Sequence, residues 1–126
     1  MKSFIFAIFM AIIITAGCLF YTNRLNNLST ELDDQCITIL NSIKEEDFEK
    51  AWENTQYLEE FLEEKKVILA SFIDHNELDK VEMYLEQMKV YIAEEKRSDA
   101  LANCKSLSAL FLHFPKNYKV KIENIL

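Results

Sequence analysis

The sequence predicts an all-α protein: an N-terminal transmembrane helix followed by an antiparallel four-helix bundle or by two stacked helical hairpins. Glycine and proline occur once each in 126 residues, whereas tight β-hairpins depend on glycine. Leu, Glu, Lys and Ala are frequent, and these residues favour helices. An uncharged apolar run precedes a strongly acidic remainder. We therefore divide the chain into an anchor, residues 1–23, and an acidic helical domain, residues 24–126.

The anchor is predicted from the segment Phe4–Tyr21, which contains no charged residue. As a helix it spans about 27 Å, close to the ~30 Å hydrocarbon core of a bilayer. A buried helix of this length in a soluble protein would normally carry a polar stripe, and this segment has none. We therefore expect residues 4–21 to contact membrane lipid.

Two other interpretations of this segment stay open. A cleaved signal peptide is disfavoured because no small-x-small site follows the apolar run. A lipoprotein anchored at Cys18 is the stronger alternative, because Thr15-Ala16-Gly17-Cys18 is similar to the bacterial lipobox. The apolar run nevertheless continues to Tyr21, and Cys18 is equally suited to lipid contact as an apolar residue.

The orientation follows from the charges that flank the anchor. Lys2 and the amino terminus lie on one side, and Arg24 lies on the other, where acidic residues soon follow. The positive-inside tendency then puts the N-terminus in the cytoplasm and the helical domain outside. The prediction is a single-pass protein of the cell membrane.

Four amphipathic helices are predicted in the domain, because apolar residues recur at three- and four-residue steps. Their ranges are about 24–44, 48–73, 77–95 and 99–114. Asp47 and Ser98 are suited to cap the second and fourth helices. Pro115 is expected to stop the fourth, and a C-terminal tail is expected to fold back onto the bundle. The short loops make successive helices antiparallel.

Two features bear on how these helices associate. A shift of 49 residues aligns Ile43, Glu45, Glu46, Ala51, Asn54 and Leu58 with Ile92, Glu94, Glu95, Ala100, Asn103 and Leu107. This pattern suggests a duplicated hairpin, although amphipathic hairpins align partly by chance. Cys36 and Cys104 should lie at similar heights on neighbouring helices in a closed bundle, and apart in an open stack.

Several function classes are disfavoured. The formal net charge of −7 opposes nucleic-acid binding, which requires basic groups. The three cysteines form no CxxC pair and have no zinc-finger spacing to histidine. The only glycine lies in the anchor, and no nucleophile has a base at recognisable spacing. We therefore predict no catalytic residues, no cofactor and no enzymatic activity.

The candidate metal ligands are His75, Asp79 and His113. His75 and Asp79 are four residues apart and share a helix face, and His113 is expected to end a helix at the same end of the bundle. Turn formation, capping and interaction with helix C-termini account for the same residues. A stripe of acids on the second helix is expected to be solvated, with docking of a basic partner as the alternative; it comprises Glu49, Glu53, Glu60 and Glu64.

Two further sets of residues are predicted to contact partners. The aromatic set lies off the apolar stripes, as partner-binding aromatics often do; it comprises Phe61, Tyr84 and Tyr91. The basic set follows Pro115 and should face anionic lipid, because the fourth helix returns to the membrane; it comprises Lys116, Lys119 and Lys121.

Three segments carry a family resemblance. They are Ile73-Asp74-His75-Asn76-Glu77-Leu78, Leu112-His113-Phe114-Pro115-Lys116 and Ile122-Glu123-Asn124-Ile125-Leu126. With them, nearly the whole chain resembles the clostridial domain-of-unknown-function family numbered 4363. The resemblance implies a small membrane-anchored helical protein of Gram-positive, often spore-forming, bacteria, and it supplies no activity or site. Asn76 stands where an acid is expected, which weakens the metal hypothesis.

The functional prediction is a membrane-anchored, non-enzymatic helical interaction module that holds or regulates a protein of the cell envelope. The alternative is an extracytoplasmic sensor domain that binds a small ligand or a metal. A hydrolase or transferase is a third and less favoured hypothesis.

Overall fold

The computed structural model describes residues 1–125, with side chains described up to Pro115. Its helices are α1 (Lys2–Lys44), α2 (Phe48–Glu64), α3 (Lys66–Phe72), α4 (His75–Ala93) and α5 (Arg97–Ile125). No strand occurs within this described range. The all-α prediction is confirmed.

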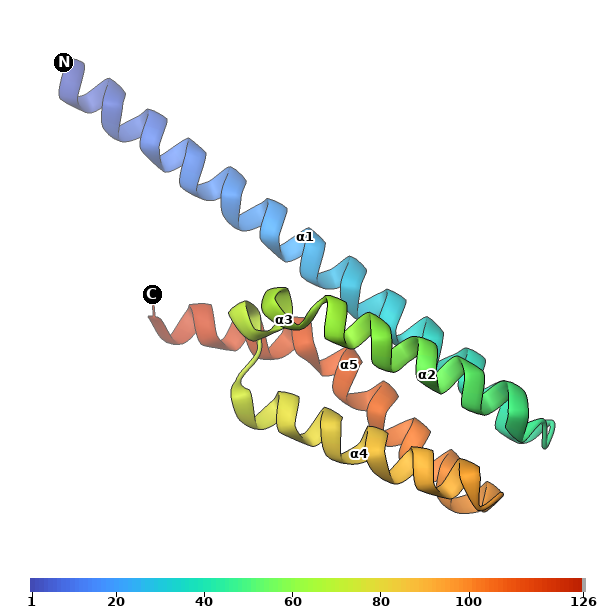
Figure 1. Cartoon of the computed structure of the whole chain (residues 1–126). Helices are drawn as coiled ribbons and strands as arrows, with labels where there is room; N and C mark the ends of the chain where they lie inside the picture. The colour runs from blue at the N-terminus through green and yellow to red at the C-terminus, as the bar shows by residue number, and fades with distance from the viewer. Residues whose placement is uncertain (126) are drawn as a thin grey trace.

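Helix α1 has two parts with different environments. Its N-terminal half projects beyond the other helices (Figure 1). This half is long and apolar enough to cross a membrane, a property that signal sequences share, and no residue of its 18-residue apolar window is buried. The second half buries one face in the domain, as its apolar stripe predicts; the buried apolar residues are Leu25, Leu28, Leu32, Cys36, Ile39 and Ile43.

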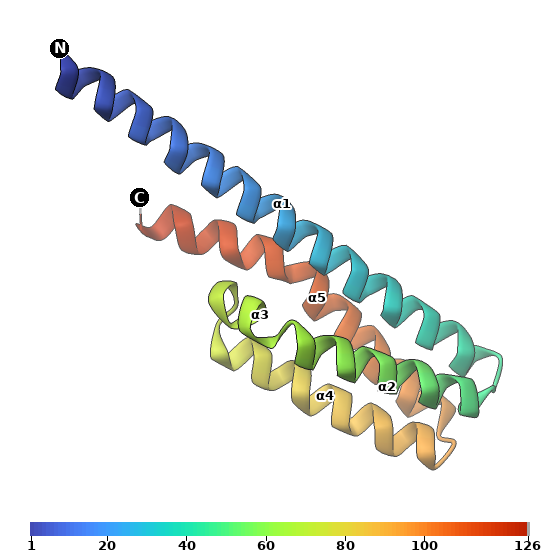
Figure 2. The same cartoon turned by 45° about the horizontal axis from the view of Figure 1, so that its top comes forward.

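The helices form a closed bundle. α1 packs against α2, α2 against α4, α4 against α5, and α5 against α1 (Figures 1 and 2). The contact between the first and last helices excludes an open stack of hairpins. Cys104 Sγ on α5 donates a hydrogen bond to the carbonyl oxygen of Cys36 on α1 at 3.1 Å. The two cysteines therefore lie at the same height, as expected for a closed bundle.

Both of these thiols are free, and each side chain is about 1% exposed. The hydrogen bond with Cys104, followed by burial, raises the pKa of the Cys36 thiol far above its usual range. Since the thiolate is the reactive form, we expect neither domain thiol to react with N-ethylmaleimide at pH 8 in a Cys18→Ser chain. Intact mass should show no adduct in the folded protein and two in urea. Labelling of the folded protein at the rate of the unfolded one would contradict this packing.

The turn between α1 and α2 and the turn between α4 and α5 have the same conformation. Glu46 and Glu95, 49 residues apart, have φ values of 59° and 58°. The amide of Glu46 donates to the carbonyl oxygen of Ile43 at 3.0 Å, and the next amide, of Asp47, donates to Ser42 at 3.0 Å. The equivalent bonds of the second turn are 3.1 and 2.8 Å. Matching turns at the spacing of the sequence repeat support a duplicated hairpin.

A left-handed backbone at Glu46 predicts a stabilising substitution. A residue with a Cβ pays about 1 kcal/mol in this conformation, and glycine does not. We therefore expect Glu46→Gly to raise the free energy of unfolding by up to about 1 kcal/mol. The measurement is urea unfolding in non-ionic detergent, followed by the fluorescence of Trp52, the only tryptophan.

The preceding residue supplies the matched control. Glu45 has φ −80°, so Glu45→Gly should lower stability by about 0.5–1 kcal/mol through the greater freedom of the unfolded chain. If both substitutions changed the free energy of unfolding in the same direction, the left-handed conformation of Glu46 would be contradicted.

The expectation that Pro115 ends a helix is wrong, because α5 continues to Ile125. A proline inside a helix leaves the carbonyl of the residue four positions earlier without its donor, and that residue is Phe111. In this structure Ser29 Oγ on α1 donates to the Phe111 carbonyl oxygen. A buried serine thus replaces the missing bond. The segment predicted as a folded-back tail is helical, and α5 bends along its length in both views (Figures 1 and 2).

This replacement predicts a non-additive pair of substitutions. Ser29→Ala should lower the free energy of unfolding by about 1–3 kcal/mol, because the buried Phe111 carbonyl would lose its donor. In a Pro115→Ala chain the new amide can donate to Phe111, so Ser29→Ala should there cost under about 1 kcal/mol. The four-variant cycle, measured by urea unfolding, isolates this coupling. Equal costs in both backgrounds would mean that Ser29 does not compensate for the proline.

Two other helix boundaries differ from prediction, and one predicted cap is confirmed. The helix expected over residues 48–73 is divided at Lys65, because Lys65 and Lys66 occupy the turn that would continue the apolar stripe. Asp47 caps α2 by accepting from the Lys50 amide at 3.2 Å, as predicted. α5 begins at Arg97, so Ser98 lies in its first turn and is not its cap.

Candidate functional site

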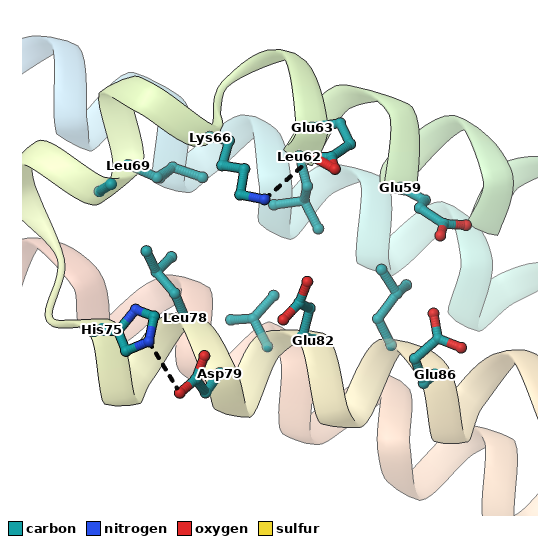
Figure 3. Close-up of a pocket in the computed structure, with 13 residues that line it drawn as sticks. Glu59, Leu62, Glu63, Lys66, Leu69, His75, Leu78, Asp79, Glu82 and Glu86 are labelled. Atoms are coloured by element: carbon teal, nitrogen blue, oxygen red, sulfur yellow. Dashed lines mark ion pairs between the residues drawn. The ribbon is translucent and has the colours of Figure 1, made fainter.

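A hollow of about 280 Å³ lies between α2 and α3 on one side and α4 on the other (Figure 3). We name it the α2–α4 groove. Its apolar lining consists of Leu62, Leu69, Ala70, Leu78, Val81 and Leu85. Its polar lining consists of Glu59, Glu63, Lys66, His75, Asp79, Glu82 and Glu86. The groove therefore combines an apolar floor with a mainly acidic rim.

The break between α2 and α3 accompanies the groove. Leu62 lies before the break, and Leu69 lies after it, seven residues further along the chain. Lys66, placed between them, has a side chain that is 67% exposed and pairs with Glu63 at 3.8 Å. Because Lys65 and Lys66 occupy this turn, no apolar side chain from it packs against α4 between Leu62 and Leu69.

A lysine that lies outside the lining bridges the two walls of the groove at one end. Lys89 Nζ on α4 lies 3.0 Å from a carboxylate oxygen of Glu59 on α2 and 3.6 Å from one of Glu86. The hydrogen bond to Glu59 is the main cause of a raised pKa at Lys89. The lysine is 22% exposed, so this pair joins the two walls in partly shielded surroundings.

Glu82 is the central charge of the rim. Figure 3 shows its carboxylate in the space between the walls, facing the side that carries Lys66. Within the described part of the chain, Glu82 has neither an ion pair nor a hydrogen bond. The groove therefore presents an unpaired carboxylate above its apolar floor.

The candidate metal ligands are only partly brought together. His75 Nε2 lies 3.6 Å from Asp79 Oδ2, with side chains 89% and 57% exposed. His113 is exposed on α5, and among the described residues no group of three or more metal-binding side chains is found. The expectation that both histidines end helices is wrong. His75 begins α4, and His113 lies inside α5.

The predicted contact residues have different environments. Phe61, Tyr84 and Tyr91 are half-buried and pack against the core, and the Lys65 ammonium lies 5.8 Å from the Phe61 ring centre. Intramolecular packing accounts for their positions, and a role in partner binding stays a prediction. The acidic stripe on α2 is exposed throughout. The side chains of Lys116, Lys119 and Lys121 lie outside the described part, so their lipid contact also stays a prediction.

Of the groove acids, only Asp79 was a predicted site residue, as a candidate metal ligand. Asp79, Glu82 and Glu86 recur at three- and four-residue steps on α4, which was a readable signal. Glu59 and Glu63 show the same spacing on α2. Periodicity places each set on one helix face, but it does not reveal that the two faces border the same hollow.

The groove thus offers an apolar floor bordered by carboxylates, most of them exposed. No curated protein and no solved structure matches the chain. A family model matches residues 19–125, which includes the end of the apolar segment and nearly all of the helical domain. The chain therefore belongs to the family described as Domain of unknown function (DUF4363).

Proposed function

We propose that this protein is a membrane-anchored, non-enzymatic interaction module that holds or regulates another protein of the cell envelope. The observation that carries the proposal is the α2–α4 groove. An open hollow with an apolar floor and an unpaired carboxylate is suited to receive side chains of another molecule. Leu69, Val81 and Leu85 of the floor also belong to the buried core, and the half-buried Leu62 and Leu78 lie beside them.

The proposal places the domain outside the cytoplasm of a Gram-positive, clostridial cell. Residues 4–21 would cross the membrane once, with the N-terminus in the cytoplasm. Support comes from the apolar half of α1 and from the charges beside it. The alternative anchor is a lipid on Cys18, which would leave the domain in the same compartment.

A docking role is favoured over a sensor role by the form of the groove. Pockets for small molecules typically enclose most of their ligand in about 300–1,000 Å³. The present hollow, at about 280 Å³, is near the lower end of this range and is open at the surface between helices. It therefore suits a few side chains of a protein better than an enclosed ligand. The His75–Asp79 pair is too exposed to form a protected metal site.

Site-specific photocrosslinking in living cells tests this function. A benzophenone amino acid at position 82 should give one dominant adduct with a protein of the envelope, identified by mass spectrometry. The same probe at Glu53, an exposed acid on α2 outside the groove, should not give that adduct. The adduct from position 82 should also disappear when Leu78 is replaced by Asn. Absence of an adduct, or the same adduct from both positions, would refute the proposed function.

A further inference from the structure

We infer that the α2–α4 groove receives a basic amphipathic helix, in which apolar side chains spaced over two turns enter the floor and Lys or Arg side chains meet the rim. The inference rests on the proposed function and specifies the chemistry of the partner segment. Three observations carry it: the spacing of the apolar residues in the floor, the negative charge of the rim, and the Lys89 bridge between the walls at one end.

The floor has the spacing of a helical partner. Leu78, Val81 and Leu85 on α4 are spaced i, i+3 and i+7, which spans about 10 Å of helix. On the opposite wall, Leu62 and Leu69 are also seven residues apart. Both rows therefore repeat over two helical turns. Leu69, Val81 and Leu85 are at most 4% exposed and form the bottom of the groove, so the accessible apolar contact comes mainly from the half-buried Leu62 and Leu78. A helix lying along the groove would present its own i, i+3 or i+4, and i+7 side chains at the same spacing.

The rim selects the charge of that helix. Five carboxylates line the groove with a single lysine, Lys66, which already pairs with Glu63 at 3.8 Å. Asp79 is 57% exposed, and Glu82 is unpaired in the described part of the chain. A helix with Lys or Arg beside its apolar stripe would pair with these carboxylates. An acidic helix would be repelled, and so would an anionic lipid headgroup.

The lysine bridge sets where the occupant lies. Lys89 pairs with Glu59 and Glu86 at one end of the groove. Away from this bridge lie Glu82, which is unpaired in the described part of the chain, and Asp79, whose contact is the exposed His75. An occupant of about three turns, some 11 residues, would cover these two acids and the flanking positions.

Fluorescence anisotropy with a defined peptide tests the inference. The protein is the full chain in nanodiscs of zwitterionic lipid, and the probe is a labelled 14-residue helix of Leu at i, i+3, i+7 and i+10 with Lys and Ala elsewhere. We expect binding at low salt. Two control peptides should not bind: one with Glu in place of Lys, and one of the same composition with scrambled Leu spacing. Empty nanodiscs measure partition of the peptide into lipid.

Matched variants locate the binding. Glu82→Lys should weaken binding at least about tenfold, and Glu82→Gln should weaken it less. Glu53→Lys, the same charge change outside the groove, should have little effect. Leu78→Ala should weaken binding, whereas Leu101→Ala, another half-buried leucine that packs on the core, should not. The fluorescence of Trp52 and the helical content checked by circular dichroism confirm that each variant is folded.

The outcomes separate the inference from the proposed function. Equal weakening by Glu82→Lys and Glu53→Lys, or equal binding of the scrambled peptide, would reduce the interaction to general charge attraction and overturn the inference. Self-association of the chain that disappears with Glu82→Lys would identify a second copy as the occupant and also overturn it. A photoadduct from position 82 with no peptide binding would refute the basic helix as occupant but not the proposed function. Peptide binding without any photoadduct in cells would refute the proposed function, although the groove would still bind a basic helix.

Discussion

Replacement of Phe111 by alanine is expected to lower the free energy of unfolding by about 3–5 kcal/mol. Phe111 is fully buried, and its ring contacts the ring of Phe114 edge-on at 5.7 Å between centres. It lies where α5 packs on α1, beside the Ser29 hydroxyl. Small domains are stable by only about 5–15 kcal/mol in total. This loss would therefore remove a large part of the domain's free energy of unfolding.

The measurement is urea unfolding of the full chain in non-ionic detergent, with Trp52 as the reporter of the domain. Leu112→Ala is the matched control, because Leu112 is 52% exposed on the next position of the same helix. It should change stability by less than about 0.5 kcal/mol. If the two substitutions cost the same, the orientation of α5 in the bundle would be contradicted.

The apolar core was predictable from the sequence because burial and helical periodicity agree along most of the chain. The stripes from Leu25 to Ile43 and from Val81 to Ile92 are buried as expected. Spacing of this kind is a local property, so it can be read without knowledge of the neighbouring helices. The short turns predicted antiparallel neighbours but left a closed bundle and an open stack as alternatives, and the contact between α1 and α5 decides for the closed bundle.

The errors occur where a distant residue determines the local structure. Pro115 has the usual properties of a helix-ending residue, but Ser29, on another helix, supplies the missing donor. No local pattern reveals this pairing. α4 begins at His75, two residues before the predicted start, because Ile73 and Asp74 alone form the turn. Phe114 is fully buried and was not assigned to the core, because the helix was expected to end beside it.

The candidate site was less predictable than the fold. The acids of the groove were visible in the sequence as ordinary charged faces of two helices. They became a site only because α2 and α4 are neighbours and because the turn at Lys65–Lys66 contributes no large apolar side chain. A hollow forms where no side chain fills the space between two helices. Whether the space is filled depends on which helices are neighbours, and the sequence of one helix does not reveal this.

Two arginines in the centre of the apolar segment should abolish membrane insertion. Ile12 and Ile13 are exposed in the half of α1 that lies outside the bundle. Each central arginine costs about 3 kcal/mol on an insertion scale, so Ile12→Arg with Ile13→Arg should cost about 6 kcal/mol, or more than 10⁴-fold in the insertion equilibrium. With alkaline phosphatase fused after Leu126, the parent chain should be active and the double-arginine chain inactive. The double Ile→Leu chain, which keeps the apolar character, should stay active.

Activity of the double-arginine fusion would contradict export through this segment, and an inactive parent would contradict the orientation. Export alone does not distinguish a membrane-spanning helix from a lipid anchor, because the lipoprotein interpretation also needs an apolar segment. Cys18→Ser separates them. A helix that spans the bilayer does not require this thiol, since Cys18 is an exposed position among apolar neighbours. The variant should therefore keep its full mass and resist carbonate extraction as the parent does. A parent chain shortened to begin at Cys18, with a mass increase that the serine variant lacks, would replace the helical anchor by a lipid. The helical domain, whose buried residues begin at Leu25, would keep its fold in either case.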